Sequence, residues 1–228
     1  MAPALPLLLP QALWIRRTAL RLPDAAQPWQ GTVACSGAAE TGEPFKLLLI
    51  GESTVAGVGV DSQAEALSGQ LAMQLAATLQ RPVCWQACGC NGARASDLID
   101  GSLELTDARW DAVVIVLGVN DTTHLTPRWR WRKNIRQLVR RFAGSCDRVV
   151  LTGVPPLGEF SALPQPLRGW FGLRAGLLDQ DLKAVARLEG VTHLPFGFLF
   201  APGMLARDGY HPSAEGYRVW AAHIVGQF

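Results

Sequence analysis

The sequence lacks a strong excess of charge of either sign. Its 228 residues include 21 basic and 19 acidic side chains, which gives a formal net charge of +2 at pH 7. A protein that binds nucleic acid mainly through phosphate contacts needs a clear positive excess, so this composition excludes such a role. One local basic stretch, 128–141, is better explained as the solvated face of an amphipathic helix than as an anion or membrane-surface site.

The sequence also lacks a cysteine pattern that would indicate disulfides or zinc. There are five cysteines, an odd number, and Cys84, Cys88 and Cys90 crowd one stretch that is expected to run from a strand into a loop. No histidine or further cysteine follows at zinc-finger spacing. We therefore expect small packing residues here, with no metal site, and reduced thiols favour a cytoplasmic location.

The N-terminal segment lacks the features of a signal peptide and of a membrane-spanning helix. It is apolar, but it has no early positive charge, it is interrupted by Pro3, Pro6 and Pro10, and it then meets Arg16 and Arg17. Such a stretch is too short to span a bilayer. It is expected either to pack on the domain as an arm or to lie on a membrane surface, with packing favoured. We assign residues 1–44 to this arm and a linker, the linker from Gly31 to Pro44, and residues 45–228 to one folded domain.

Internal repeats are absent, and strand and helix patterns instead alternate along the chain. Apolar runs bounded by proline or glycine indicate buried strands, and apolar residues at a spacing of three or four indicate helices. This alternation predicts an α/β fold with a parallel sheet covered by helices on both faces. The expected strands are 45–50, 83–87, 112–117, 149–152 and 191–194, and the expected helices are 64–79, 95–103, 129–142, 176–188 and 214–225.

Three polar clusters follow expected strands, and a fourth precedes the last helix. Ser53, Gly92 and Asn120 each come just after a strand, so right-handed crossovers place them on one edge of the sheet. Near the C-terminus, Asp208 stands three residues before His211, so one short loop can present both side chains. The sequence thus brings a hydroxyl, an imidazole and a carboxylate within reach of one another.

This set of residues is suited to nucleophilic catalysis. A serine hydroxyl needs a base to take its proton, and the base needs a third group to orient it, which assigns Ser53 as nucleophile, His211 as base and Asp208 as the orienting acid. The oxyanion formed on attack needs hydrogen-bond donors. The candidates are the backbone amides of Ser53 and Gly92 and the side-chain amide of Asn120.

Each cluster taken alone also has a structural explanation. Ser53 could be a helix N-cap or turn residue, Asn120 could belong to a turn, and Asp208 with His211 could cap the last helix. The order of all four clusters, each after the appropriate element, favours the catalytic interpretation. His124 is a further candidate base, although a surface or helix-entry histidine is the better explanation.

Two other functional patterns are incomplete. Val55 stands where the Gly-x-Ser-x-Gly nucleophile elbow needs its second glycine. The Gly57-Val58-Gly59 run lacks the third glycine of a dinucleotide-binding loop.

The chain resembles the SGNH, or GDSL-type, esterase and lipase family across residues 45–228. The matching blocks are Gly51-Glu52-Ser53-Thr54, Asn91-Gly92-Ala93 ahead of Asp97-Leu98, Gly118-Val119-Asn120-Asp121, and Asp208-Gly209-Tyr210-His211-Pro212. The resemblance implies a flavodoxin-like three-layer α/β/α sandwich with a five-stranded parallel sheet, the catalytic roles given above, and neither metal nor organic cofactor. Two residues depart from the family pattern: Glu52 replaces the usual Asp, and Asn91 replaces a frequent Ser or Thr. We expect the Glu52 carboxylate to support its loop.

These observations predict a serine esterase for small or medium acyl esters, with a small-molecule ester as its partner and no nucleic acid. The alternative is a lysophospholipase or thioesterase acting at a membrane surface through the N-terminal arm. An inactive binding protein with the same fold is disfavoured by the intact blocks. A proline-rich apolar loop after the fourth strand is expected to wall an acyl pocket, to act as a lid, or to pack against the arm. Its apolar residues are Phe160, Leu163, Leu167, Trp170 and Phe171.

Overall fold

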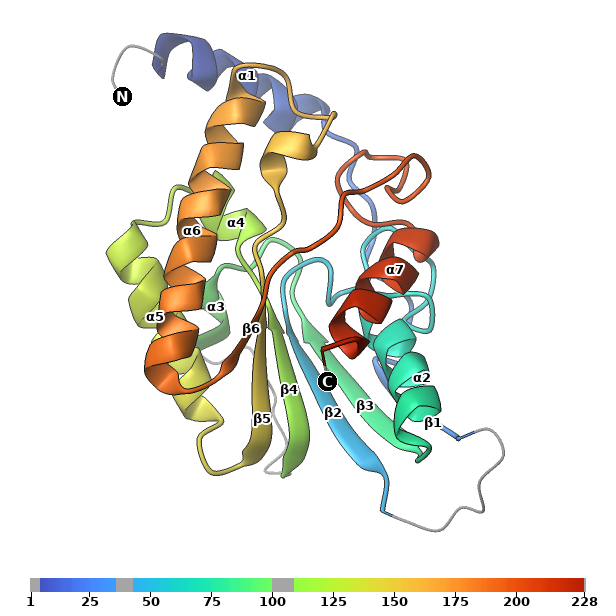
Figure 1. Ribbon diagram of the computed structural model, residues 1–228. Coiled ribbons are helices and arrows are strands. Elements are labelled where there is room, and N and C mark those ends of the chain that lie inside the picture. Colours follow the sequence, from blue (N-terminus) through green and yellow to red (C-terminus); the bar gives the residue numbers. More distant parts are fainter. Residues whose placement is uncertain (1–4, 36–42, 100–108, 228) are drawn as a thin grey trace.

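The computed structural model describes residues 5–35, 43–99 and 109–227, and these form three layers around one sheet (Figure 1). The sheet has six strands in the order β1-β3-β2-β4-β5-β6. The strands are β1 Gln30–Val33, β2 Phe45–Gly51, β3 Val83–Gly89, β4 Trp110–Val116, β5 Cys146–Thr152 and β6 Thr192–Leu194.

The five predicted strands form the parallel part of the sheet. Strands β3, β2, β4, β5 and β6 pair in parallel with their neighbours, in the order of a flavodoxin-like fold. This confirms the predicted α/β class. The sheet has six strands rather than five because β1 adds to β3 in antiparallel orientation. Residues Gly31–Val33 therefore belong to a strand and not to the expected linker.

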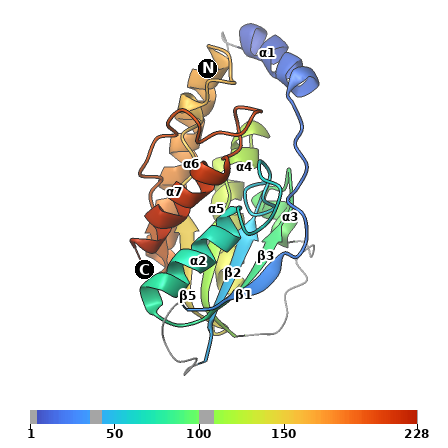
Figure 2. The same cartoon turned by 90° about the vertical axis from the view of Figure 1, so that its right-hand side faces the viewer.

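Helices cover both faces of the sheet. Figure 2 shows α2 and α7 together on one face, and α5 and α6 lie on the other (Figure 1). All five expected helices are present, although positions 100–103 of the expected 95–103 helix lie outside the described residues. The helices that were not predicted are α1, α4 and the short 3-10 helix η2. The helices are α1 Leu5–Thr18, α2 Leu67–Leu79, α3 Ala95–Ile99, α4 Val119–Thr123, α5 Arg128–Arg141, η2 Leu157–Glu159, α6 Leu167–Glu189 and α7 Ala214–Val225.

The alternating side chains of β2 explain its continuous apolar sequence. Leu47 and Leu49 join the core formed with α2 and α7, whereas Leu48 and Ile50 join the core formed with α5 and α6. Successive residues of a strand point to opposite faces, so a central strand between two helical layers must be apolar at every position. This central strand leads directly to Ser53.

The basic stretch on α5 faces α6. The ion pairs are Arg128–Asp181, Arg132–Asp181, Arg136–Glu189 and Arg140–Glu189. The two acidic side chains are nearly buried and the arginines are partly exposed, which is the arrangement of a solvated helix face tied to its neighbour. This agrees with the interpretation favoured from the sequence.

Helix α1 packs on the domain near the start of α6. Leu8, Ala12 and Ile15 pack against the core on the α5 and α6 side of the sheet. Gln11 donates a hydrogen bond to the Gln165 carbonyl at 2.6 Å and accepts one from the Leu167 amide at 3.2 Å. None of the helices in the described ranges is long and apolar enough to cross a membrane.

Two glycines provide a test of the backbone packing behind the site. Gly89 ends β3, and a Cβ there would collide with the backbone of Val55 and Ala56, whereas a Cβ on Gly176, in the middle of α6, would meet nothing within 4 Å. Gly89→Ala should lower the free energy of unfolding by about 1–3 kcal/mol. Gly176→Ala should raise it by about 0.5–1 kcal/mol, because alanine favours a helix. Urea denaturation measures both, and wild-type stability of the Gly89→Ala variant would contradict the predicted close approach.

Candidate active site

The candidate site lies where β2, β3 and β4 end. Ser53 follows β2, Gly92 follows β3 and Asn120 follows β4, so the structure brings all three to the expected edge of the sheet. Gly51 pairs with both Gly89 and Val116. A Cβ on Gly51 would collide with the Val116 carbonyl oxygen, so only glycine lets the Ser53 loop leave the sheet at this point.

The side chains of Ser53, His211 and Asp208 form one hydrogen-bonded chain. His211 Nε2 lies 2.9 Å from Ser53 Oγ, and His211 Nδ1 lies 2.6 Å from Asp208 Oδ2. An ionised carboxylate can only accept, so the Nδ1 atom carries the ring proton and Nε2 is free to accept from the serine hydroxyl. This is the tautomer in which an imidazole can take a proton from serine.

Backbone amides of the loop 208–211 fix the position of the Asp208 carboxylate. Asp208 Oδ1 accepts hydrogen bonds from the backbone amides of Tyr210 and His211 at 2.9 and 3.1 Å. Burial alone would raise the pKa of Asp208, but the hydrogen bonds from the His211 ring and from these amides outweigh it and hold that pKa below its usual value. Asp208 is therefore ionised near neutral pH, as the tautomer argument requires.

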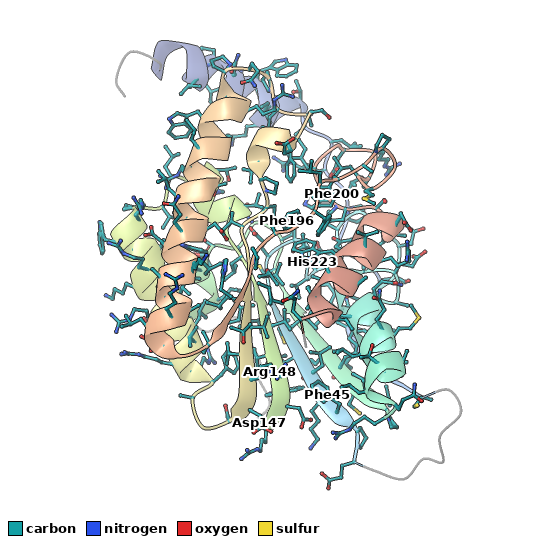
Figure 3. The ribbon with its side chains drawn as sticks, viewed as in Figure 1. Phe45, Asp147, Arg148, Phe196, Phe200 and His223 are labelled. Carbon is teal, nitrogen blue, oxygen red and sulfur yellow. The ribbon has the colours of Figure 1, made fainter. Side chains whose placement is uncertain are left out.

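An aromatic cluster anchors the segment that leads to this loop. Figure 3 labels Phe196 and Phe200, in the segment between β6 and α7, and His223 on α7. The ring centroids of Phe196 and Phe200 are 5.5 Å apart, and Phe196 also packs 5.1 Å from Trp220 of α7. The segment between β6 and α7 is thus fixed by side-chain packing rather than by regular secondary structure.

Glu52 connects the serine loop to α4. The carboxylate is almost fully buried and accepts three hydrogen bonds: from the Val119 amide at 3.0 Å, from the Asn120 amide at 2.9 Å, and from Asn120 Nδ2 at 2.6 Å. Burial raises the pKa of Glu52 from 4.5 to about 7, although the three hydrogen bonds favour the ionised form and oppose this shift. The side chain joins the loop to the next strand end, as expected from the sequence.

The three candidate oxyanion donors differ in how they are held. One proton of the Asn120 side-chain amide is directed at Glu52, and an amide carries a second proton that remains available for another acceptor. In the described part of the chain, no group accepts a hydrogen bond from the backbone N–H of Ser53 or of Gly92. Gly92 has a φ of +83° in the turn after β3, a conformation that suits glycine.

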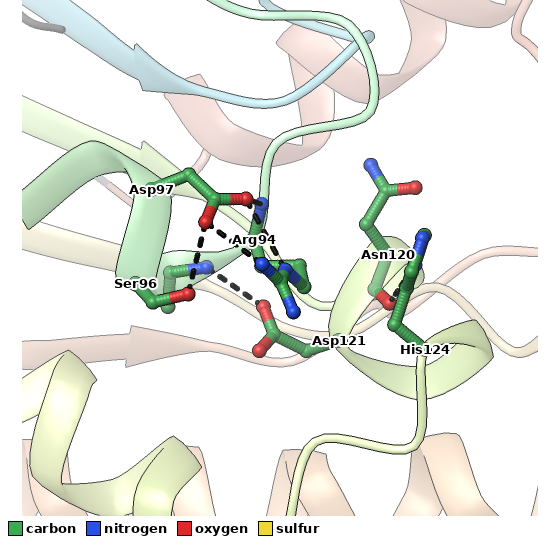
Figure 4. A network of polar contacts seen from close by, with 7 residues as sticks. Arg94, Ser96, Asp97, Asn120, Asp121 and His124 are labelled. Atoms are coloured by element: carbon green, nitrogen blue, oxygen red, sulfur yellow. Dashed lines mark hydrogen bonds and ion pairs between the residues drawn. The ribbon is translucent and has the colours of Figure 1, made fainter.

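Asp121 ties the second and third strand ends together. Its buried carboxylate accepts a hydrogen bond from the Ala95 amide at 2.9 Å, at the start of α3 (Figure 4). Burial raises the pKa of Asp121 above its ordinary value. In the same network Arg94 pairs with Asp97 at 3.1 Å and remains partly exposed. Arg94 is thus held by Asp97, in the first turn of the helix α3 that follows it.

Two candidates from the sequence are explained by local structure. His124 is exposed and follows α4, where its Nδ1 atom lies 3.0 Å from the Asn120 carbonyl, so it ends the helix as a surface residue. The apolar residues expected in a loop after β5 lie partly in α6, which begins at Leu167. Gln11 of α1 makes hydrogen bonds to residues 165 and 167 at this start, whereas Phe160 packs against the rings of Phe200 and Tyr210.

Two supporting residues were not predicted from the sequence. The Tyr217 hydroxyl of α7 donates to the Val58 carbonyl at 2.7 Å, and Gln63 Nε2 donates to the Val55 carbonyl at 3.0 Å. Both side chains are buried and both hold the segment after Ser53 in place. A polar residue within an otherwise apolar helix face, as Tyr217 is on α7, was the available signal.

Comparisons with known proteins show the family to which the chain belongs. The model of the GDSL-like lipase/acylhydrolase family matches residues 49–219. The GDSL-like esterase Rv1075c of Mycobacterium tuberculosis (strain ATCC 25618 / H37Rv) is 30% identical over 188 residues, a match that covers 77% of this chain and 59% of the relative. The chain therefore spans about three fifths of the length of this curated relative.

Solved structures share the fold at lower identity. The lipase/acylhydrolase from Enterococcus faecalis is 22% identical with a TM-score of 0.61, and the match covers 80% of this chain and 94% of the other. LAE5, an α/β hydrolase enzyme from the metagenome of Lake Arreo, Spain, is 19% identical with a TM-score of 0.61, covering 85% and 95%. Both likenesses extend over most of the three-layer sandwich.

The raised pKa of Glu52 predicts a specific pH dependence of stability. The folded state holds the Glu52 proton up to about pH 7, whereas the unfolded chain releases it near 4.5, so the free energy of unfolding falls between these values as pH rises. The loss from this group is roughly 3 kcal/mol, because each tenfold change in proton affinity corresponds to about 1.4 kcal/mol. Urea denaturation at several pH values should show that Glu52→Gln removes this part of the slope.

The matched control is Glu65→Gln, because Glu65 is exposed and accepts a hydrogen bond from the nearby Ser62 hydroxyl, at 3.2 Å. This variant should keep the wild-type slope. Identical slopes for Glu52→Gln and the wild type would show that Glu52 does not titrate in this range.

Proposed function

Because the chain belongs to the GDSL-like lipase/acylhydrolase family, we propose that it is a serine esterase that hydrolyses carboxylic esters of small or medium acyl chains. The observation that carries this proposal is the 2.9 Å contact of His211 Nε2 with Ser53 Oγ, together with the 2.6 Å contact of His211 Nδ1 with Asp208. A nucleophile, a base and an orienting acid stand in the order that acyl transfer needs.

In the first half-reaction, Ser53 Oγ attacks the ester carbonyl while its proton moves to His211 Nε2. The buried Asp208 carboxylate stabilises the imidazolium that forms. Charge then develops on the carbonyl oxygen, and the free amides of Ser53 and Gly92 with the second Nδ2 proton of Asn120 are the available donors. One such donor contributes roughly 3 kcal/mol to transition-state stabilisation.

Collapse of the tetrahedral intermediate releases the alcohol and leaves an acyl group on Ser53. The leaving oxygen takes the proton held by His211. In the second half-reaction a water loses its proton to His211 and attacks the acyl-enzyme, which releases the acid and restores the serine hydroxyl. Each half uses the same base, so loss of His211 affects both.

The surroundings of the proposed base support an apolar acyl group. Tyr210 stands between Asp208 and His211, and its ring lies 6.3 Å from Phe160, which in turn lies 5.9 Å from Phe200. Phe160 is buried, and the partly exposed rings of Phe200 and Tyr210 offer apolar surface next to the catalytic loop. The second candidate, a lysophospholipase or thioesterase, is supported by α1, which lies beyond the strand ends that carry Ser53 and Asn120 (Figure 1). Faster turnover of lysophospholipid or acyl-thioester than of simple esters would favour it.

Hydrolysis of p-nitrophenyl acetate, butyrate and octanoate tests the proposal. We expect Ser53→Ala and His211→Ala to lower kcat by at least about 10³-fold, because either change removes proton transfer to or from the nucleophile. The matched histidine control is His124→Ala, which changes an exposed residue and should retain turnover within about threefold. Turnover that is absent in the wild type, or equal in the wild type and Ser53→Ala, would rule out the esterase mechanism.

A further inference from the structure

We propose that the outward face of α1 is a docking surface for a lipid bilayer with anionic headgroups. The surface consists of Leu13, Trp14, Arg16, Arg17 and, just after the helix, Leu20 and Arg21. The proposal concerns where the protein binds and does not depend on the esterase mechanism.

The inner face of α1 is already occupied by the domain. Leu8, Ala12 and Ile15 are partly buried against the core, and Gln11 makes both of its side-chain hydrogen bonds to residues 165 and 167. In an α-helix each residue turns about 100° from the one before, so these four positions share one side. The helix is therefore held lengthwise against the protein, with its other side directed outward.

The outward side carries large apolar groups that the domain leaves uncovered. Leu13 is 46% exposed and Trp14 is 58% exposed, and Leu20 beyond the helix end is 51% exposed. Single exposed apolar residues are common on soluble proteins, but three within eight positions of the chain form a local patch. An indole ring with an apolar body and a polar N–H suits the boundary between lipid headgroups and acyl chains.

The charged residues around these apolar side chains indicate a partner with negative charge. Arg16, Arg17 and Arg21 are exposed, and residues 5–23 contain no aspartate or glutamate, since the first acidic residue is Asp24. A helix with arginines beside exposed tryptophan and leucine has the pattern of an interfacial helix on anionic lipid. The charge is local, because the whole chain carries only +2.

The position of α1 relates such a surface to the candidate active site. Figures 1 and 2 show α1 at the end of the molecule toward which the parallel strands run, beside the start of α6. Ser53 and Asn120 lie at these strand ends. A bilayer bound to α1 would therefore lie on the side of the protein where the site is located.

The other basic surface of the protein is a weaker candidate. Helix α5 also has an exposed tryptophan, Trp129, at 57% exposure, next to a groove lined by Arg132, Lys133 and Arg136. However, Arg132 and Arg136 are paired with acids of α6, and the guanidinium of Arg130 stacks over the Trp129 ring at 5.2 Å. Trp129 is accordingly a matched control: a tryptophan of similar exposure among arginines, on a different helix.

Co-sedimentation of the full chain with vesicles tests the proposal. The probes are vesicles of phosphatidylcholine alone and of phosphatidylcholine mixed with phosphatidylglycerol. We expect binding to the mixed vesicles and at least about tenfold weaker binding to the neutral ones, because arginines near an anionic surface add to the attraction. The double variants Leu13→Ser/Trp14→Ser and Arg16→Gln/Arg17→Gln should each weaken binding to mixed vesicles by about tenfold or more. Trp129→Ser should bind as the wild type does.

Three results would overturn the proposal. The first is absence of binding to the mixed vesicles. The second is an equal loss of binding in Trp129→Ser and Leu13→Ser/Trp14→Ser. The third is self-association, seen by sedimentation velocity, that Leu13→Ser/Trp14→Ser abolishes while vesicle binding is unchanged, since this would assign the surface to a second copy of the chain. The readout is binding rather than hydrolysis, so failure here leaves the proposed esterase function untouched.

Discussion

The buried carboxylate of Glu52 is the interaction on which the geometry of the candidate site depends. Glu52 stands in the loop after β2. Its carboxylate accepts hydrogen bonds from two backbone amides and one side-chain amide of the segment after β4, at 2.6 to 3.0 Å. The sheet brings the ends of β2 and β4 near each other, and these hydrogen bonds fix the segments that follow them in one arrangement. The relative position of the neighbouring Ser53 and the Asn120 amide depends on this contact. A longer acid than aspartate can make it here because α4 presents two amides and a side chain to the same carboxylate.

This arrangement has an energetic consequence for the whole protein. Burial raises the pKa of Glu52 to about 7, so the free energy of unfolding falls as the group ionises near neutral pH. Asp208 has the opposite relation, since its hydrogen bonds hold its pKa low and favour the charged form. Ionisation of Glu52 therefore destabilises the folded state, whereas ionisation of Asp208 stabilises it. Such opposed environments are typical of functional sites, where stability is given up for a fixed geometry.

Much of the fold could be predicted from the sequence, because buried parallel strands leave a strong signal. The apolar run 45–50 and the polar residues after it identified a central strand and its edge. The missed elements lack such signals. Strand β1, Gln30–Val33, is four residues long and mostly exposed, and α4 is a five-residue helix whose composition is typical of a turn. The first part of α6 contains glycines and follows prolines, which indicated a loop. The partners of Glu52 lie 67 and 68 positions further along the chain, so only the folded structure identifies them.

We propose above all that Ser53 is a nucleophile activated by His211 and Asp208. The most direct measurement is labelling of the intact protein with a fluorophosphonate, followed by tandem mass spectrometry of the digested adduct. The reagent reacts with an activated serine and mimics the tetrahedral intermediate. We expect a single covalent phosphonate on Ser53, formed in the wild type and lost in His211→Ala. A label on another residue, or equal labelling of Ser53 without His211, would contradict it.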